Sequence, residues 1–333
     1  MPKKVVEKDF DFYIDEYMYN CRSRRLRPKT MQSYEQTLRL FERWCADVVN
    51  ISEPAAVTDS VLRRYICDLQ ERGKYTFYAS EKTKNINCPE RRRDYRNEIT
   101  VTTINNYIRN LRAFFTWYSE TEQQHNPMEK IKTFKNGRKV KDYLEDEEVE
   151  RLLKCFDLSY FSEHRDYMIT MLLLDTGMRI GECLKVTVDD VDMRERTITL
   201  PAENTKGRKD RVVFFSVRAH RSLMRWLRFK ERYTDSELLF SVKSGTRLEV
   251  HTFERNFKKY IAASDIAKDV TPHALRNNFA KRCLMNGMDL YTLSRILGHS
   301  SVTVTEKAYL DLTDRDLRHR YQQFSPLENL RSR

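Results

Sequence analysis

The chain has 333 residues, of which 40% are apolar, enough for one large or two modest domains with buried cores. Its 61 lysines and arginines exceed its 49 acids, giving a formal charge of +12 that is typical of proteins that meet polyanions, although an ordinary basic protein can share it. The seven cysteines form no CxxC pair, so neither a disulfide framework nor a zinc site is indicated. No apolar run can cross a bilayer and no signal peptide is visible, so we expect a cytoplasmic protein rather than a membrane or secreted one.

Residues 1–122 are expected to form a four-helix domain, because apolar residues recur at helical spacing within 10–18, 31–45, 62–69 and 104–115. Thr58 is expected to cap the third helix and Gly73 to stop it, and Thr102 or Thr103 to start the fourth. The solvent sides of the second and fourth helices carry donors suited to phosphates and base edges: Lys29, Thr30, Gln32, Ser33, Asn105, Asn106, Arg109 and Arg112. An ordinary polar face is the alternative interpretation.

Two segments lack this periodicity. Residues 74–99 form a long loop rich in Lys, Arg and Asn, which either follows a DNA backbone or is a solvated charged loop. Residues 123–142, polar and basic with one proline and one glycine, are expected to link the first domain to a second over 143–333.

The second domain is expected to be mainly α with a small β-sheet. Several acidic residues near residue 146 are expected in the first turn of a helix, where the helix dipole favours negative charge. An apolar helix is expected over 167–174, and Arg179 follows it. Alternating runs over 196–200 and 211–215 predict a β-hairpin with Lys206 near its tip, followed by the candidate DNA contacts Arg208 and Lys209.

One further block suggests phosphate chemistry. His273 and Arg276 stand at i and i+3 of an expected helix, His299 follows a glycine, and Tyr309 lies ten residues beyond. Arginine matches phosphate oxygens, histidine adds a hydrogen bond and tyrosine offers a nucleophilic hydroxyl. Each piece alone also suits a surface pair or a core tyrosine. Arg179 strengthens the case, because a basic side chain at the end of a strongly apolar run needs a partner, and phosphate is one.

Taken together, TGMRIGE, NTKGRKDR, HALR, LGHSS and EKAYL resemble, in this order, the tyrosine recombinases, also called phage-type integrases. The resemblance covers the C-terminal half, and Asn277 departs from the basic residue that many members have after the second arginine. It implies two phosphate-clamping arginines, a hairpin lysine as general acid, two further active-site histidines, a tyrosine nucleophile and a supporting acid: Arg179, Arg276, Lys206, His273, His299, Tyr309 and Glu182.

The resemblance also implies a helical SAM-like core-binding domain and a catalytic domain that close as a C-shaped clamp on double-stranded DNA core sites. It implies strand transfer through a 3′-phosphotyrosyl bond and an association with the nucleoid. No nucleotide-binding loop or clustered acids are visible, so we expect no metal and no other cofactor.

The favoured function is site-specific recombination by a tetramer on two DNA sites, passing through a Holliday junction. The long basic loop favours a mobile-element integrase, with a possible accessory directionality factor and a C-terminal tail that docks on a neighbouring subunit. The alternatives are a chromosome-dimer resolvase of the Xer kind, a type IB-like topoisomerase and a non-catalytic DNA-binding regulator.

Overall fold

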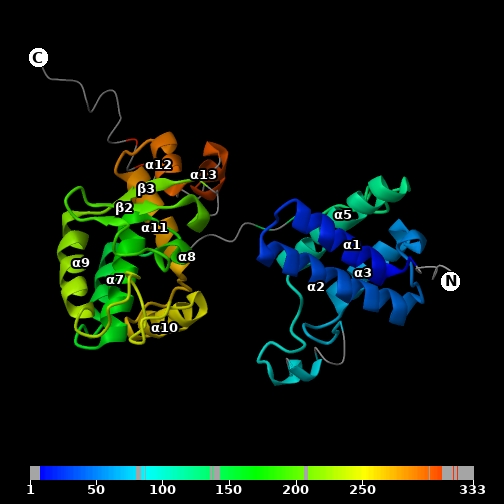
Figure 1. Ribbon diagram of the computed structural model, residues 1–333, viewed down its shortest axis with the longest axis horizontal. Coiled ribbons are helices and arrows are strands. Elements are labelled where there is room, and N and C mark those ends of the chain that lie inside the picture. The colour runs from blue at the N-terminus through cyan, green and yellow to red at the C-terminus, as the bar shows by residue number, and fades with distance from the viewer. Residues whose placement is uncertain are drawn as a thin grey trace, which may run out of the picture. The chain divides into compact units, whose positions relative to one another are not determined.

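The computed structural model describes residues 8–79, 84–86, 88–135, 137, 143–205, 209–299, 301–309, 318 and 321. The chain divides into two compact units, Met1–Arg138 and Lys139–Arg333, and each has its own hydrophobic core. Both units are mainly helical and a small antiparallel sheet lies in the second, which confirms the predicted fold class (Figure 1). No helix within the described ranges is long and apolar enough to cross a membrane.

Four long helices build the first unit around an aromatic core. The ring of Phe41 packs against those of Phe10, Tyr65 and Phe115, with centroids 6.0, 4.9 and 6.1 Å apart, so one side chain of α2 contacts the other three helices. The bounds are α1 Phe10–Ser23, α2 Pro28–Trp44, a π-helical turn Cys45–Val49, short 3-10 turns Pro54–Ala56 and Pro89–Arg91, α3 Asp59–Glu71 and α5 Val101–Glu122.

The helix starts follow from capping side chains. The Thr58 hydroxyl accepts a hydrogen bond from the Val61 N–H, which confirms the predicted cap of α3. The predicted start of α5 at Thr102 or Thr103 was wrong, because the helix begins at Val101 and its cap is Thr100, whose hydroxyl accepts a hydrogen bond from the Thr103 N–H. Three threonines follow one another closely here, and the sequence alone does not decide which one caps.

Gly73 has a different role from the predicted helix stop. The helix α3 ends at Glu71, and Gly73 instead forms a β-bridge with Glu98 at the base of the 74–99 loop. A Cβ at position 73 would lie 2.4 Å from the Cα of Arg96, so glycine is needed for two backbone segments to approach closely.

Part of the segment predicted as a linker packs on the first unit. Met128 and Ile131 are buried in its core, and the backbone of Phe134 pairs with the side-chain amide of Asn105. Residues 136 and 138–142 of the predicted linker lie outside the described part of the chain.

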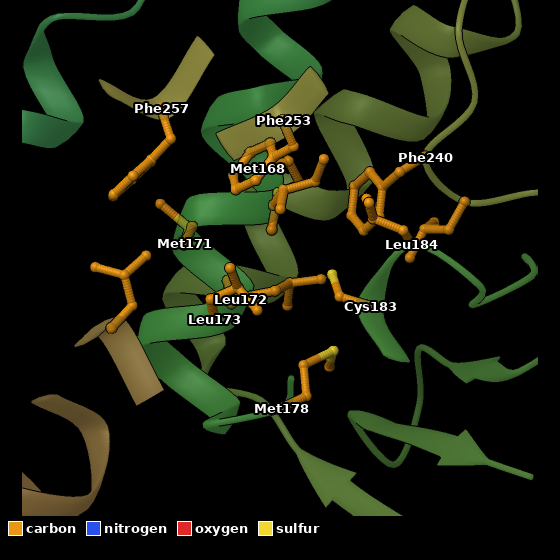
Figure 2. Packing of buried hydrophobic residues seen from close by; sticks show 14 of the residues in the cluster. Met168, Met171, Leu172, Leu173, Met178, Cys183, Leu184, Phe240, Phe253 and Phe257 are labelled. Carbon is orange, nitrogen blue, oxygen red and sulfur yellow. The ribbon is translucent and has the colours of Figure 1, made fainter. Parts of the chain in front are cut away.

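The second unit is organised around α7, whose side chains are buried on nearly all sides. This helix packs against α9 and α11, and Figure 2 shows Met168, Leu172 and Leu173 in a cluster with Phe253 of α10 and Cys183 of α8. The helices are α6 Asp146–Lys154, α7 Phe161–Thr176, α8 Ile180–Cys183, α9 Val217–Lys230, α10 Val250–Ala263, α11 Pro272–Met285, α12 Leu290–Leu297 and α13 Val302–Tyr309.

The sheet has the order β1-β2-β3, with both neighbouring pairs antiparallel. Its strands are β1 Val191–Asp192, β2 Thr197–Leu200 and β3 Arg211–Phe214, and a 3-10 turn Ala202–Asn204 follows β2. The register pairs Ile198 with Val213, and both are buried. Because side chains alternate along a strand, this register also determines which other positions of the hairpin face inward.

A buried ion pair within α7 is hydrogen-bonded to α10. The Nε and Nη2 atoms of Arg165 donate to Oδ1 of Asp166 at 2.9 and 2.8 Å, while Asn256 and Tyr260 of α10 donate to Oδ2 at 3.0 and 3.2 Å. The Arg165 Nη1 atom donates to the Ser241 carbonyl oxygen. Asp166 has no exposed surface, so the pair depends on these bonds to offset its desolvation.

Replacing Asp166 with alanine should destabilise the second unit by about 3–5 kcal/mol, because the Arg165 charge would stay buried without its partner. Urea unfolding followed by hydrogen exchange of the α7 amides measures the loss. The control Glu150→Ala breaks an exposed i,i+4 pair with Lys154 and should cost only about 0.3–0.5 kcal/mol. Equal effects of the two changes would contradict a stabilising role for the buried pair.

Candidate active site

Arg179 lies in a tight turn at the end of α7. Gly177 ends the helix with a φ of +64°, and a Cβ there would lie 2.3 Å from the ring of Phe279, so the turn requires glycine. Arg179 then caps α8 and is held by Glu182: its N–H donates to Oε2 at 3.0 Å and its Nη1 to Oε1 at 2.8 Å. The carboxylate, which is 3% exposed, thereby orients both the backbone and the guanidinium of Arg179.

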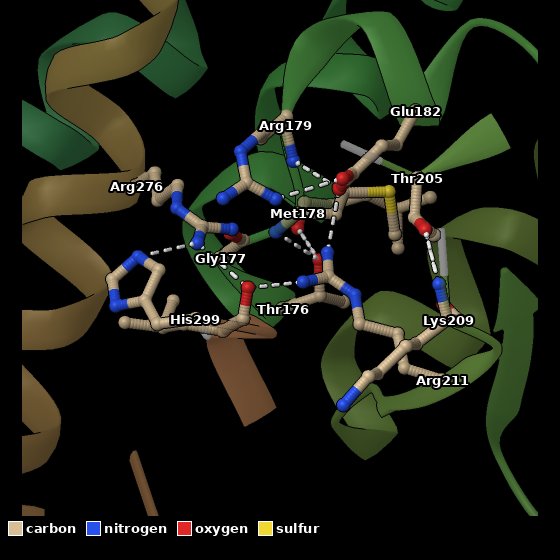
Figure 3. Close-up of polar contacts among 12 residues, drawn as sticks. Thr176, Gly177, Met178, Arg179, Glu182, Thr205, Lys209, Arg211, Arg276 and His299 are labelled. Carbon is tan, nitrogen blue, oxygen red and sulfur yellow. Dashed lines mark hydrogen bonds and ion pairs between the residues drawn. The ribbon is translucent and has the colours of Figure 1, made fainter. Parts of the chain in front are cut away.

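Arg276 of α11 is buried between the ends of two helices. Its Nη1 donates to the carbonyl oxygen of Gly177 and its Nη2 to that of Leu297, both at 2.7 Å (Figure 3). These carbonyls close α7 and α12, where helix ends leave acceptors unpaired and carry partial negative charge. The guanidinium satisfies both ends, which explains how a residue only 2% exposed keeps its charge.

His299 is held as a neutral ring with a defined tautomer. The Arg276 Nη2 lies 3.0 Å from Nε2, and since arginine can only donate, Nε2 accepts and the proton lies on Nδ1. That Nδ1 donates to the hydroxyl of Thr305 in α13 at 2.7 Å. Burial, then the charges of Arg276, Arg179 and other basic neighbours, lower the pKa of His299 from 6.5 to about 4.

Arg211, which the sequence reasoning missed, is the fourth basic group of the cluster. Its Nη2 donates to Glu182 Oε2 at 2.5 Å and its Nη1 to the Leu297 carbonyl oxygen. Gly298 lies so close that an added Cβ would be 2.5 Å from Nη1. Strand alternation could have found Arg211, because it precedes the buried Val213 by two positions and so shares its inward face.

A cleft of about 750 Å³ opens beside this cluster, lined in part by Arg179, Arg211 and His299. The Arg179 side chain is 25% exposed and that of Arg211 9%, so Arg179 is the more open to an incoming ligand. The cluster holds three guanidinium groups, of which Arg179 and Arg211 contact its one carboxylate and Arg276 contacts helix-end carbonyls, which leaves an excess of positive charge suited to a phosphodiester. Within the described residues, no three His, Cys, Asp or Glu side chains gather as metal ligands.

The other predicted site residues are described unequally. His273 lies in the first turn of α11 and is exposed, and Lys209 is exposed at the rim of the cleft. Tyr309 is the last residue of α13, and only its backbone is described. Lys206 and Arg208 lie outside the described residues, as does nearly all of the predicted C-terminal docking tail.

The proposed DNA-facing side of the first unit needs one correction. Asn105 is 6% exposed, and its amide pairs with the backbone of Phe134 at 3.0 and 2.8 Å, because the chain folds back over this end of α5. Arg112 is half-buried and donates to the Ile131 carbonyl oxygen. The remaining candidates are exposed except for the half-buried Thr30: Lys29, Gln32, Ser33, Asn106 and Arg109.

Known proteins share both units. Residues 142–316 match the model of the phage integrase family, and residues 14–85 match the phage integrase N-terminal SAM-like domain. Tyrosine recombinase XerD of Listeria innocua is 30% identical over 320 residues, covering 94% of this chain and 98% of that protein.

Solved structures agree. XerA recombinase is 26% identical with a TM-score of 0.51, covering 94% of this chain and 98% of that one. The Tn1549 transposon integrase in complex with transposon right end DNA is 20% identical with a TM-score of 0.69, covering 94% and 99%, and this likeness shows the shared fold.

The family match spans every described residue of the arginine cluster, from Arg179 to His299. It covers more than half of the chain, and the XerD relative extends over nearly all of it. The chain therefore belongs to the phage integrase family and is a tyrosine-type site-specific recombinase, an enzyme that breaks and rejoins DNA.

Proposed function

We propose that Tyr309 is the nucleophile of a reversible transesterification at a DNA phosphodiester. Its oxygen bonds to phosphorus while the bond from phosphorus to the 5′ oxygen breaks, leaving a 3′-phosphotyrosyl link and a free 5′ hydroxyl. The tyrosine proton passes to His273, and Lys206 supplies a proton to the departing oxygen. One ester replaces another, so the bond energy is retained for rejoining and no nucleotide cofactor is consumed.

The observation that carries this proposal is that Arg179 and His299, from two separate elements, line one cleft, while the buried Arg276 of a third element is hydrogen-bonded to His299. A phosphorus that becomes five-coordinate gains negative charge, and fixed cationic donors stabilise that charge without reorganising. Arg179 is the most exposed of the three arginines in the cluster, so we assign it the direct contact with a non-bridging oxygen.

The fold supports the place of Tyr309. Thr305 contacts His299, so its side of α13 is turned to the arginine cluster. Position 309 lies one helical turn beyond Thr305, on the same face of α13. This supports Tyr309 as the nucleophile, because the backbone at position 309 continues the face of α13 that contacts His299.

We propose double-stranded core sites as the DNA partner, contacted by both units. The exposed donors of the first unit then contact the backbone, among them Lys29, Gln32 and Arg109. The Tn1549 integrase structure is a complex with DNA, which supports the same partner here. Strand exchange between two sites requires four subunits and a Holliday junction intermediate, and a directionality factor fits as an accessory protein.

For the biological role we propose integration and excision of a mobile element, on the basis of the long basic 74–99 segment. Chromosome-dimer resolution is the second candidate, because the XerD relative matches nearly the whole chain. The covalent adduct distinguishes them: forming it at the joined ends of the element supports integration, and forming it only at a chromosomal site supports resolution.

Tyr309→Phe should abolish the SDS-resistant protein–DNA adduct and leave duplex affinity within about twofold, because the substitution removes only the nucleophilic oxygen. A labelled core duplex with a nick near the cleavage site traps the adduct for gel analysis. The control Tyr291→Phe changes an exposed tyrosine on the rim of the cleft and should retain the adduct. An adduct that survives in Tyr309→Phe would show that another residue attacks.

Arg211→Gln should slow adduct formation about 10- to 100-fold at saturating DNA, about 1.4–2.7 kcal/mol in the barrier, because Glu182 and the Leu297 carbonyl lose their shared donor. Arg211→Lys should recover only part of the rate, since lysine lacks the guanidinium fork. The control Arg295→Gln, an exposed residue lining the same cleft, should lower DNA affinity and leave the saturated rate unchanged. The opposite pattern would make Arg211 a DNA-binding rather than a positioning residue.

The stability of the second unit should depend on His299 below neutral pH. Its folded-state pKa is depressed, so the unfolded chain binds a proton at higher pH than the native protein does. The neutral ring thus contributes stability that is present above about 6.5 and is lost as pH falls towards about 4. Urea midpoints between pH 7 and pH 4 should fall less steeply in His299→Gln than in the wild type, and parallel curves would disprove the assignment.

A further inference from the structure

The helix α9 carries a row of arginines that the active site does not use. Successive positions three and four residues apart fall within about 80° of one another around the helix axis and extend over about 15 Å. All four side chains are exposed: Arg218, Arg221, Arg225 and Arg228.

This arginine row has no acidic counterpart in the described part of the chain. No ion pair joins any of the four to a described acid, and α9 contains no aspartate or glutamate between Ser216 and Lys230. Like charges three and four residues apart repel one another, and Arg218 lies in the first helical turn, where the helix dipole disfavours a cation. The row therefore weakens the helix that carries it, unlike an ordinary solvated face with mixed charges.

The core keeps the row in place. On the opposite side of α9, Ala219, Leu223 and Trp226 are buried, and the Trp226 Nε1 donates to the Leu239 carbonyl oxygen at 2.9 Å. The helix packs on α7, which in Figure 1 lies between α9 and α11. None of the residues that line the active-site cleft belongs to α9, so the row is a separate surface on the outside of the second unit.

We infer that the arginine row of α9 binds the phosphate backbone of a DNA segment outside the recombination site. Arginine forks match phosphate oxygens in pairs, and neighbouring row members are about 4.5–6 Å apart along the axis, within reach of successive phosphates of a strand. A rigid helix that presents unpaired cations in a line fits a stiff, uniformly charged duplex better than an acidic protein surface, whose charges are irregular. The inference does not depend on the roles of Tyr309 or the arginine cluster.

The test is the salt dependence of full-length protein binding to a fluorescent 30-base-pair duplex of arbitrary sequence. In the triple variant Arg221→Gln, Arg225→Gln, Arg228→Gln, the slope of log affinity against log salt should become shallower by roughly 2–3, because each lost phosphate contact removes about 0.9. Affinity at low salt should fall at least about tenfold. Arg218 is left intact because it follows closely on Phe214, which lines the cleft.

A matched control removes the same charge from another exposed helix of the second unit. The variant Arg255→Gln, Lys258→Gln, Lys259→Gln on α10 should change the slope by less than about one. Equal slope changes in the two variants would show that the effect depends only on net charge and would overturn the inference. An unchanged slope in the α9 variant, together with lost binding to poly-L-glutamate, would overturn it in favour of an acidic protein partner.

A second readout guards against misfolding. Removing like charges from α9 should leave the urea unfolding midpoint of the α9 variant equal to or above that of the wild type. If that midpoint falls, the single change Arg225→Glu replaces the triple variant, and its slope should become shallower by about one or more. An unaltered slope in Arg225→Glu would again contradict DNA binding by the row.

Discussion

The guanidinium of Arg276 joins the carboxyl-terminal ends of α7 and α12, and the site depends on this junction. Gly177 and Leu297 supply the carbonyl oxygens that accept from it. Two residues beyond each of them lies a residue of the site, Arg179 after Gly177 and His299 after Leu297. One buried cation thereby sets the distance between two loops that are far apart in sequence. The helix ends also lower the cost of burying its charge, because their carbonyls carry partial negative charge.

Glu182 is the second residue that holds the site together, because it orients the other two arginines of the cluster. It accepts from the backbone and guanidinium of Arg179 and from Arg211, so a single buried carboxylate orients two arginines from different elements. One acid cannot neutralise three guanidinium groups, and the pKa of His299 is lowered partly for that reason. The free site is therefore electrostatically incomplete, and a phosphodiester is the ligand that would complete it.

Motifs and periodicity predicted much of this arrangement. The Thr58 cap, the hairpin and the convergence of Arg179, Arg276 and His299 each depend on local patterns or on a resemblance in order. Arg211 was not predicted as a site residue, because its role depends on strand register and on its contact with Gly298, which is distant in sequence. Asn105 was misjudged for a similar reason: its partner is the returning backbone of Phe134, and helical phase alone does not predict such a contact.

The arginines of the second unit show two opposite ways of holding positive charge. Inside the site, each buried guanidinium is held by a carboxylate or by helix-end carbonyls, so its geometry is set before any ligand arrives. On α9, the exposed charges have no described acidic partner, so they are available to bind an external anion. Preformed donors suit catalysis, where reorganisation slows the reaction. Exposed donors without an acidic partner suit a phosphate backbone that is bound without regard to sequence.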